Sequence, residues 1–283
     1  MAVVNPVTGK PFLFGSRAMT APETAQYGSV RPVSFAAYLP GGVKGVNALL
    51  TGATVTLPTP PRQGTYADAP GVQTALAQSY RNNELNDCII AACAHSLNIV
   101  IGNNGTGPPP VYTDAQIGAN YQTWCGWDGF TTPGPGCNPI VVLEGMKSTG
   151  FTGAGDQIYG YAHVNFQRPQ EMRTAIYLFE NLFLELELDL EWLLTWNGLP
   201  GFKWDIQTPI TLSELHAVAI TQWQTGYLFI DSWGIQGAIT NRAIATYGLG
   251  AYVILTKEIL NASTHKSKSG YNWSQLVADL GAV

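Results

Sequence analysis

The chain has 283 residues, of which 46% are hydrophobic and only 12% are charged, roughly half the charged share of about 25% in an average globular protein. Its formal net charge is −5, and its 14 Lys and Arg form no basic block. We therefore expect no nucleic acid among its partners, because such binding neutralises phosphates with clustered cations. The 31 Gly and 18 Pro predict a fold rich in loops and turns.

The apolar pattern indicates neither export nor membrane insertion. Residues 1–10 lack a positively charged start followed by an apolar run, so we expect no secretory signal. The longest apolar stretch, residues 176–194, is interrupted by five acids, which are prohibitive in a membrane span. We therefore expect no membrane partner.

Residues 1–71 are rich in Pro, Gly, Thr and Ala and show little helical periodicity. Three prolines within 58–61 predict extended chain, and the short apolar pieces 33–38 and 53–57 fit edge strands. We interpret this region as an extended arm that lies on the body or on a neighbouring molecule. A disordered leader is the alternative.

The next part of the chain has the pattern of helices. Asp87 is a good N-cap for a buried helix over 88–100, because its apolar and small residues repeat at intervals of three and four. A second helix is predicted over 114–123, with Thr113 as its cap, and a third over 140–149.

The last third has the pattern of strands. A helix over 169–181 with Pro in its first turn precedes the strictly alternating run 184–190, which has strand periodicity. Further strands are predicted over 215–221, 227–231 and 251–256, the first two joined by a short turn. An arm, then helices, then antiparallel strands predict an α+β fold in two packed halves.

Cys88 is the first candidate for chemistry. A cysteine at the start of a buried helix is exposed to the helix dipole and free backbone N–H groups, which favour the reactive thiolate. A cysteine on a helix of small residues is also commonly a packing residue, so this feature alone does not define a site.

His216 and Asp231 add a base and a supporting acid. His216 lies among apolar residues of a predicted strand, where a histidine by itself is commonly a core residue. Asp231 lies at the end of the partner strand, and the hairpin is expected to bring it beside His216, where a carboxylate fixes the tautomer and orientation of the imidazole. Cys88, His216 and Asp231 would then be nucleophile, base and support.

These residues resemble the papain-like cysteine peptidases. That family has a histidine in a His-Ala-Val strand and an asparagine in Asn-Ser-Trp-Gly; here His216 begins His-Ala-Val-Ala-Ile and Asp231 begins Asp-Ser-Trp-Gly. The spacings from Cys88 fall in or near the expected range of about 130 to 150 residues. The run from Asp87 to His95 also resembles uncharacterised papain-like proteins of bacteria and their phages.

The resemblance covers roughly residues 72–259 and implies a division of the chain. An arm over 1–71 would precede a papain-like domain over 72–283. That domain would have a mainly helical half over 72–168, a mainly β half over 169–260 and a C-terminal tail. We expect the β half to be antiparallel and barrel-like.

The resemblance also implies roles for single residues. Cys88 would attack a carbonyl, His216 would transfer the proton, Asp231 would orient His216, and Trp233 would shield that contact from water. The family completes its oxyanion hole with a glutamine amide six residues before the nucleophile. That position is Asn82, whose amide can donate the same hydrogen bond with a shorter reach.

Three features separate this chain from the family pattern. Asn83 and Asn86 lie near enough to Asn82 to leave the oxyanion assignment open. The family's Cys-Gly-Ser-Cys-Trp is absent. Asp87 directly precedes the candidate nucleophile, and its carboxylate would raise the pKa of the thiol unless it caps the helix outward.

Two functions follow. The first is a thiol hydrolase that cleaves a peptide or isopeptide bond in a peptide or protein substrate through an acyl-enzyme on Cys88. The alternative is a catalytically inactive papain-like structural or binding protein, such as a phage virion component that forms homo-oligomers or a virion assembly through the arm. An arm that crosses the cleft would give an inhibited, zymogen-like form. A cytoplasmic or virion-associated location suits either function.

The remaining cysteines and histidines give weaker signals. His95 lies two turns after Cys88, and it is either near the site or an ordinary core or surface histidine. Cys125 and Cys137 form a disulfide if the protein meets oxidant, but the missing secretory signal favours free thiols. Cys93, His95, Cys125 and Cys137 could be considered as zinc ligands, but their spacing matches no familiar zinc site. We therefore expect neither a metal nor another cofactor.

Overall fold

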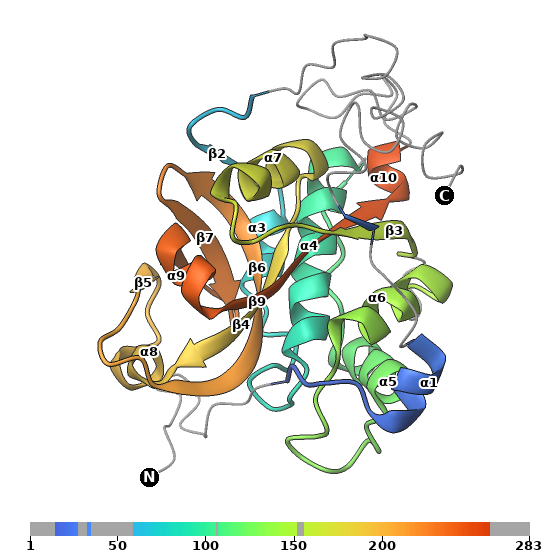
Figure 1. Cartoon of the computed structure of the whole chain (residues 1–283). Coiled ribbons are helices and arrows are strands. Elements are labelled where there is room, and N and C mark those ends of the chain that lie inside the picture. Colours follow the sequence, from blue (N-terminus) through green and yellow to red (C-terminus); the bar gives the residue numbers. More distant parts are fainter. Residues whose placement is uncertain (1–14, 28–32, 35–58, 106, 152–155, 261–283) are drawn as a thin grey trace, which may run out of the picture.

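The computed structural model describes residues 15–27, 33–34, 59–105, 107–151 and 156–260. Helices gather on one side and a large sheet on the other, with the long helix α4 (Cys88–Asn104) lying against the sheet strand β6 (Leu212–Gln224) (Figure 1). The α+β class predicted from the sequence is confirmed. The order of elements also agrees with the prediction, because the main helices precede most of the strands.

The helical half is organised around α4. Every residue from Cys88 to Val100 is buried, which explains why the sequence there carries small and apolar residues on all sides of the helix. Around it lie α3 (Val72–Leu76), α5 (Asp114–Cys125) and α6 (Pro139–Ser148), with α1 (Ala21–Tyr27) against α6. The predicted cap at Thr113 is confirmed as a full capping box.

The sheet runs in the order β1-β3-β9-β4-β6-β7-β8-β5, and β2 pairs with β6. Besides β6, its strands are β1 (Val33–Ser34), β2 (Gly64–Thr65), β3 (Ile158–His163), β4 (Phe183–Asp189), β5 (Phe202–Trp204), β7 (Tyr227–Ser232), β8 (Ile235–Thr240) and β9 (Gly248–Thr256). Within the described residues the two end strands do not pair, so the sheet is open. The barrel-like expectation is corrected to this extent. The pairs β1–β3 and β5–β8 are parallel, and the others are antiparallel.

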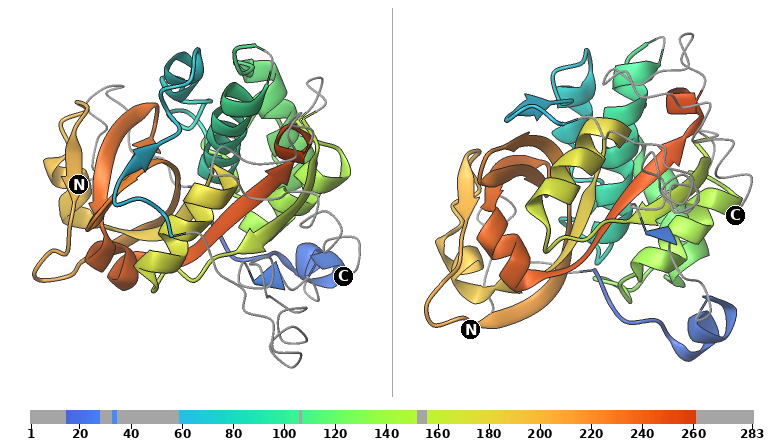
Figure 2. Two further views of the ribbon diagram at one scale, coloured as in Figure 1. Left: turned by 90° about the horizontal axis from the view of Figure 1, so that it is seen from above. Right: turned by 45° about the horizontal axis from the view of Figure 1, so that its top comes forward.

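Four shorter helices complete the β half: α7 (Pro169–Phe179), α8 (Leu190–Thr195), α9 (Asn241–Tyr247) and α10 (Lys257–Leu260). Two further views show helices α4 to α6 on one side of the molecule and strands β6 to β8 on the other (Figure 2). None of the described helices is long and apolar enough to cross a membrane.

Strands β4 and β6 separate two hydrophobic cores. Leu184 and Val218 belong to the core of the β half, whereas Phe183 and Ala217 belong to the core around α4. This division follows from strand geometry, because neighbouring side chains point to opposite faces. The alternation that predicted a strand over 184–190 therefore also determines which core each side chain enters.

Several predictions fall wholly or partly outside the described residues. Of the apolar piece 33–38 only β1 is described, and 53–57 is not. The C-terminal tail over 261–283 and most of the arm over 1–71 likewise lie outside. The described part of the arm includes residues 15–27, which pack on the helical half.

Candidate active site

The thiol of Cys88 lies at the first residue of α4, as predicted, but it is fully buried. Its Sγ accepts a hydrogen bond from the Gly15 amide at 3.3 Å. Burial raises the pKa of the thiol to about 12, against the lowering effect of the Gly15 and Ala217 amides, and the charges of Asp87 and Glu185 raise it further. In the described conformation the thiol is therefore protonated at neutral pH.

Asp87 occupies the N-cap position of α4, but its side chain makes no capping hydrogen bond. Neither carboxyl oxygen has a hydrogen-bond partner in the described part of the chain, and both are buried. Burial raises the pKa of Asp87 well above its ordinary value, chiefly by desolvation. The carboxyl thus does not cap the helix outward, and it is one reason for the raised pKa of the Cys88 thiol.

His216 is fully buried and is held by two neighbours that follow Asp231 in the chain. Its Nε2 lies 2.9 Å from Ser232 Oγ, and its ring stacks on the Trp233 indole with centroids 4.3 Å apart and planes at 16°. Burial lowers the pKa of His216 to about 3. The imidazole is therefore neutral in this state, while Trp233 covers one of its faces.

A two-residue turn gives Trp233 this position. Ser232 pairs with Ile235, so Trp233 and Gly234 alone connect β7 to β8. Both have positive φ, 55° and 75°, as tight hairpins of this length require. The left-handed conformation is unusual for a large side chain, and here it accompanies the stacking of the indole on His216.

Asp231 does not hydrogen-bond to His216. It is buried, and neither of its carboxyl oxygens has a side-chain hydrogen-bond partner among the described residues. Its Oδ1 lies 3.2 Å from Nδ1 of His95 on α4. The structure thus brings Asp231 to His95. Cys88 shares a hydrophobic core with Ala217, but the side chain of His216, one residue away on β6, points to the opposite face and contacts Ser232 and Trp233 instead of the thiol.

Asn82 is the buried one of the three asparagines before Cys88, and Asn83 and Asn86 are half-buried. Asn82 Oδ1 has no hydrogen-bond partner in the described part of the structure. Asn83 Oδ1 instead accepts from Ser79 Oγ at 2.7 Å, and Asn86 Nδ2 donates to Gly134 O at 3.1 Å. The side chains of Asn83 and Asn86 therefore already make local contacts.

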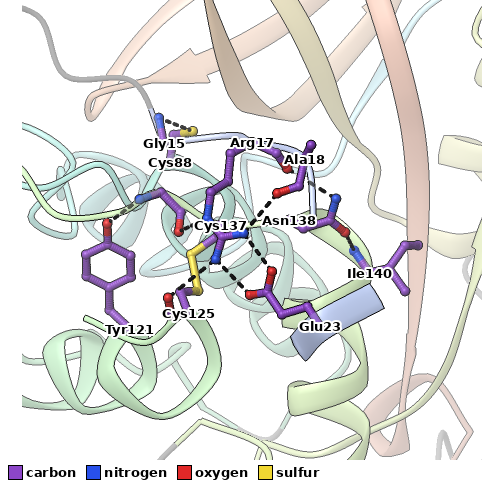
Figure 3. The surroundings of a disulfide bond; sticks show 11 residues. Gly15, Arg17, Ala18, Glu23, Cys88, Tyr121, Cys125, Cys137, Asn138 and Ile140 are labelled. Atoms are coloured by element: carbon purple, nitrogen blue, oxygen red, sulfur yellow. Dashed lines mark hydrogen bonds and ion pairs between the residues drawn. A yellow bond between two sulfur atoms is a disulfide. The ribbon is translucent and has the colours of Figure 1, made fainter. Parts of the chain in front are cut away.

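Residues 15–23, here called the N-terminal strap, lie across the start of α4 (Figure 3). Gly15 O accepts from the Cys137 amide, and the Arg17 amide donates to Cys137 O at 2.8 Å. The Arg17 side chain donates to Gly136 O at 3.0 Å and forms an ion pair with Glu23 at 2.6 Å. The strap is thus fastened mainly to the chain around Cys137.

Two further features hold the strap close to Cys88. Ser16 Oγ donates to Glu185 on β4. At Gly15 an added Cβ would overlap the Asn86 carbonyl, far inside van der Waals contact distance, and would lie 2.7 Å from the Asp87 amide nitrogen. Glycine is therefore required for this close approach, because any side chain would collide with the backbone just before Cys88.

Cys125 and Cys137 form a disulfide that connects the end of α5 to the residue before the N-cap of α6. The expectation of free thiols is corrected. It depended on an argument about the compartment of the protein, which does not bear on whether the two cysteines are close in space. Their Cα atoms are 5.3 Å apart, well within the usual range for a bridge.

Sequence reasoning missed two contributors to the site and left a third open. Gly15 lies 73 residues before Cys88, and no local pattern connects them. Ser232 was passed over in favour of its neighbour Asp231. His95 did give a signal, because it lies two helical turns after Cys88 in a segment with the pattern of a buried helix.

An open sheet packs on a central helix that begins with Cys88, and His216 lies on the neighbouring strand β6. Xylellain, a cysteine protease from Xylella fastidiosa, superposes with a TM-score of 0.58 and 15% identity over 86% of this chain and 96% of that chain. Procathepsin B S9 from Trypanosoma congolense gives 0.51 and 9% over 86% of each chain. The chain therefore has the papain-like fold, which confirms the resemblance seen in its sequence.

No protein-family model matches the sequence, and a search of curated proteins finds no match. The likeness is thus one of structure at low sequence identity, and it establishes the fold alone.

Proposed function

We propose that the protein is a papain-like thiol hydrolase that cleaves a peptide or isopeptide bond, with Cys88 as nucleophile and His216 as base. The observation that carries this proposal is the position of the thiol. Cys88 opens the central helix of a papain-like fold, its Sγ accepts a hydrogen bond from the Gly15 amide, and it shares a core with Ala217, the residue next to His216 on β6. A free thiol held at a helix start by backbone amides suits a nucleophile.

The described conformation is a closed state of such an enzyme. A thiol pKa near 12 and an imidazole pKa near 3 leave both groups neutral at pH 7, whereas thiol attack requires the thiolate. Both shifts arise mainly from burial. Withdrawal of the strap from Cys88 would admit water and substrate and lower the pKa of the thiol. His216 would also have to turn from Ser232 toward Cys88 to take the thiol proton.

In the open state the reaction would proceed in two stages. Cys88 Sγ attacks the carbonyl carbon as its proton passes to His216, and the carbonyl oxygen becomes an oxyanion near the Asn82 amide. Collapse breaks the carbon–nitrogen bond, and the leaving amine takes the proton from His216. Water then attacks the thioester with His216 as base, which releases the acid and restores the thiol.

The first experiment measures access to Cys88. Iodoacetamide labelling at neutral pH, located by mass spectrometry, should be slow in the wild type and about tenfold faster in Gly15→Ala. Tenfold corresponds to about 1.4 kcal/mol, near the upper range for one lost hydrogen bond, and the collision at Gly15 adds to the effect. Gly107→Ala is the matched control, because an added Cβ there meets nothing within 4 Å.

The second experiment measures cleavage. Gly15→Ala should cleave labelled casein, a general peptide substrate, and Cys88→Ala or His216→Gln in the same background should not. Cys93→Ala, a change at the other free cysteine of α4, should retain cleavage. A strap variant that labels readily at Cys88 but cleaves no peptide would refute the hydrolase and favour the inactive structural or binding protein.

A further inference from the structure

Asp231 would face His216 if the hairpin of β6 and β7 were regular. At the turn Gln224 pairs with Tyr227, and Gln222 pairs with Phe229. Continued without interruption, that register would place Asp231 opposite Ile220, four residues from His216 and on the same face of β6. Side chains paired across strands share a face, so Asp231 would point to the same face as His216, although about 13 Å along the strand from it.

A bulge at Thr221 reverses this arrangement. Past Thr221 the register shifts by one residue, and Asp231 pairs with Ala219 instead. One extra residue moves the following side chains to the opposite face. Asp231 therefore projects to the face of Ala219, toward α4, whereas Ser232 projects to the face of His216, whose Nε2 it approaches to 2.9 Å.

His95 meets Asp231 on the α4 side. Both residues are buried, and the Tyr80 ring lies 4.8 Å from the His95 ring, so the surroundings have little water. His95 Nε2 lies 2.9 Å from Gln78 O, and a carbonyl oxygen only accepts, so Nε2 carries a proton. His95 Nδ1 and Asp231 Oδ1 lie 3.2 Å apart without the alignment of a hydrogen bond. Two unprotonated acceptors at this distance would repel, so one of the two groups carries a proton.

The position of that second proton follows from burial. With the proton on Asp231 the pair is neutral, and with it on His95 the pair is a buried ion pair, which costs more desolvation. Burial lowers the pKa of His95 to about 4 and raises that of Asp231 well above its ordinary value. The shifts agree with a carboxylic acid facing a neutral imidazole.

The pair connects three segments that surround the candidate site. Gln78 belongs to the segment before α4 that also carries Asn82, His95 belongs to α4, and Asp231 ends β7. At the following turn the backbone of Gly234 runs so close to Ala77 that an added Cβ would lie 2.8 Å from its carbonyl oxygen. The contact between Asp231 and His95 thus fixes the turn of β7 against the segment of Asn82.

We propose that Asp231 serves His95 and not His216: the two side chains share one proton as a neutral pair that fixes the end of β7, and Ser232 is the residue that positions His216. His95 is then a positioning residue, with no contact of its own to the reacting atoms. Its effect on His216 passes through the backbone of residues 231–233. The part of this inference that concerns catalysis rests on the proposed function, whereas the pairing itself does not.

Nitrogen-15 spectra of the histidine side chains test the pairing in the full chain, which has only 4 histidines. His95→Gln and His216→Gln assign the two signals. We expect His95 to be protonated at Nε2 alone. Asp231→Asn should shift the His95 signals, because an amide, which is a weaker donor than the acid, then faces Nδ1. The His216 signals should not change, because Asp231 does not contact His216.

The reciprocal variant is Ser232→Ala, which should shift the His216 signals and leave His95 unchanged. Asp114→Asn, a change at an exposed carboxyl, is the matched control and should shift neither. The proposal is overturned if Asp231→Asn changes the tautomer of His216, or if His95 is protonated on both nitrogens. Failure of Asp231→Asn to move His95 would overturn it equally.

Cys88 labelling in the Gly15→Ala background tests the positioning role. Added to that background, Ser232→Ala should slow labelling about fivefold to tenfold, the effect of one lost hydrogen bond, whereas Asp231→Asn should change it less than about twofold. The reverse order would return the support of His216 to Asp231. If the spectra behave as expected and no variant cleaves peptide, the proposed function fails while the pairing stands.

Discussion

Removal of the disulfide between Cys125 and Cys137 should have two separable effects, the first on stability. The bridge joins residues 12 apart. In the chain-entropy model a closed loop of this size removes about 10 cal/mol/K from the unfolded chain, or about 3 kcal/mol at 25 °C. For 283 residues that loss lowers the melting temperature by roughly 5 °C.

The second effect is on access to Cys88. The strap is fastened through backbone hydrogen bonds to Cys137 itself, so greater freedom of Cys137 loosens the strap. Both effects can be measured on Cys125→Ala/Cys137→Ala. Urea unfolding should show a free energy of unfolding about 3 kcal/mol lower than in the wild type. Iodoacetamide should label Cys88 faster than in the wild type.

Reducing agent supplies the control for this experiment. Dithiothreitol should destabilise the wild type by a similar amount and leave the double alanine variant unchanged, because that variant has no bridge to reduce. A stability loss below about 1 kcal/mol would refute the loop-entropy reasoning. A full loss of stability with unchanged Cys88 labelling would refute the link between the bridge and the strap.

Two further predictions concern charge and buried polarity. The Arg17 side chain holds the pKa of Glu23 down at about 2 from 4.5, so this ion pair contributes fully above pH 4.5 and is lost as pH falls toward 2; the stability difference between the wild type and Glu23→Gln in urea unfolding should shrink over that window. Buried Asn181 donates to Ile254 O and accepts from Ile254 N, at 2.9 Å each. Asn181→Ala should cost about 1–3 kcal/mol in urea unfolding, and the exposed control Asn197→Ala should cost much less.

Local patterns predicted the elements well where one physical requirement dominates. The helix at Cys88 is buried on every side, and its sequence shows this directly. The alternation of β4 reflects two cores on opposite faces, and the cap at Thr113 depends on a side chain three residues from its partner. Each of these signals lies within one element, so a single sequence suffices to read it.

The partners of the site residues could not be predicted in the same way. Whether Asp231 faces His216 depends on one bulged residue at Thr221, and the sequence indicated the turn but not the bulge. Gly15 reaches Cys88 across 73 positions. The helix and strands that carry these residues were thus predictable, while the contacts of the residues depend on register and on distant chain.

The turn at Trp233 combines a strained backbone with an indole that stacks on His216. A two-residue hairpin is most relaxed with asparagine and glycine in its left-handed positions, and a bulky ring in the first of them carries backbone strain of order 1–3 kcal/mol. Asparagine there would relieve the backbone strain, but the imidazole of His216 would lose the ring that stacks on it. The chain has tryptophan at this position despite the strain. The sequence of the turn therefore fits the covering of the His216 imidazole better than it fits a relaxed hairpin.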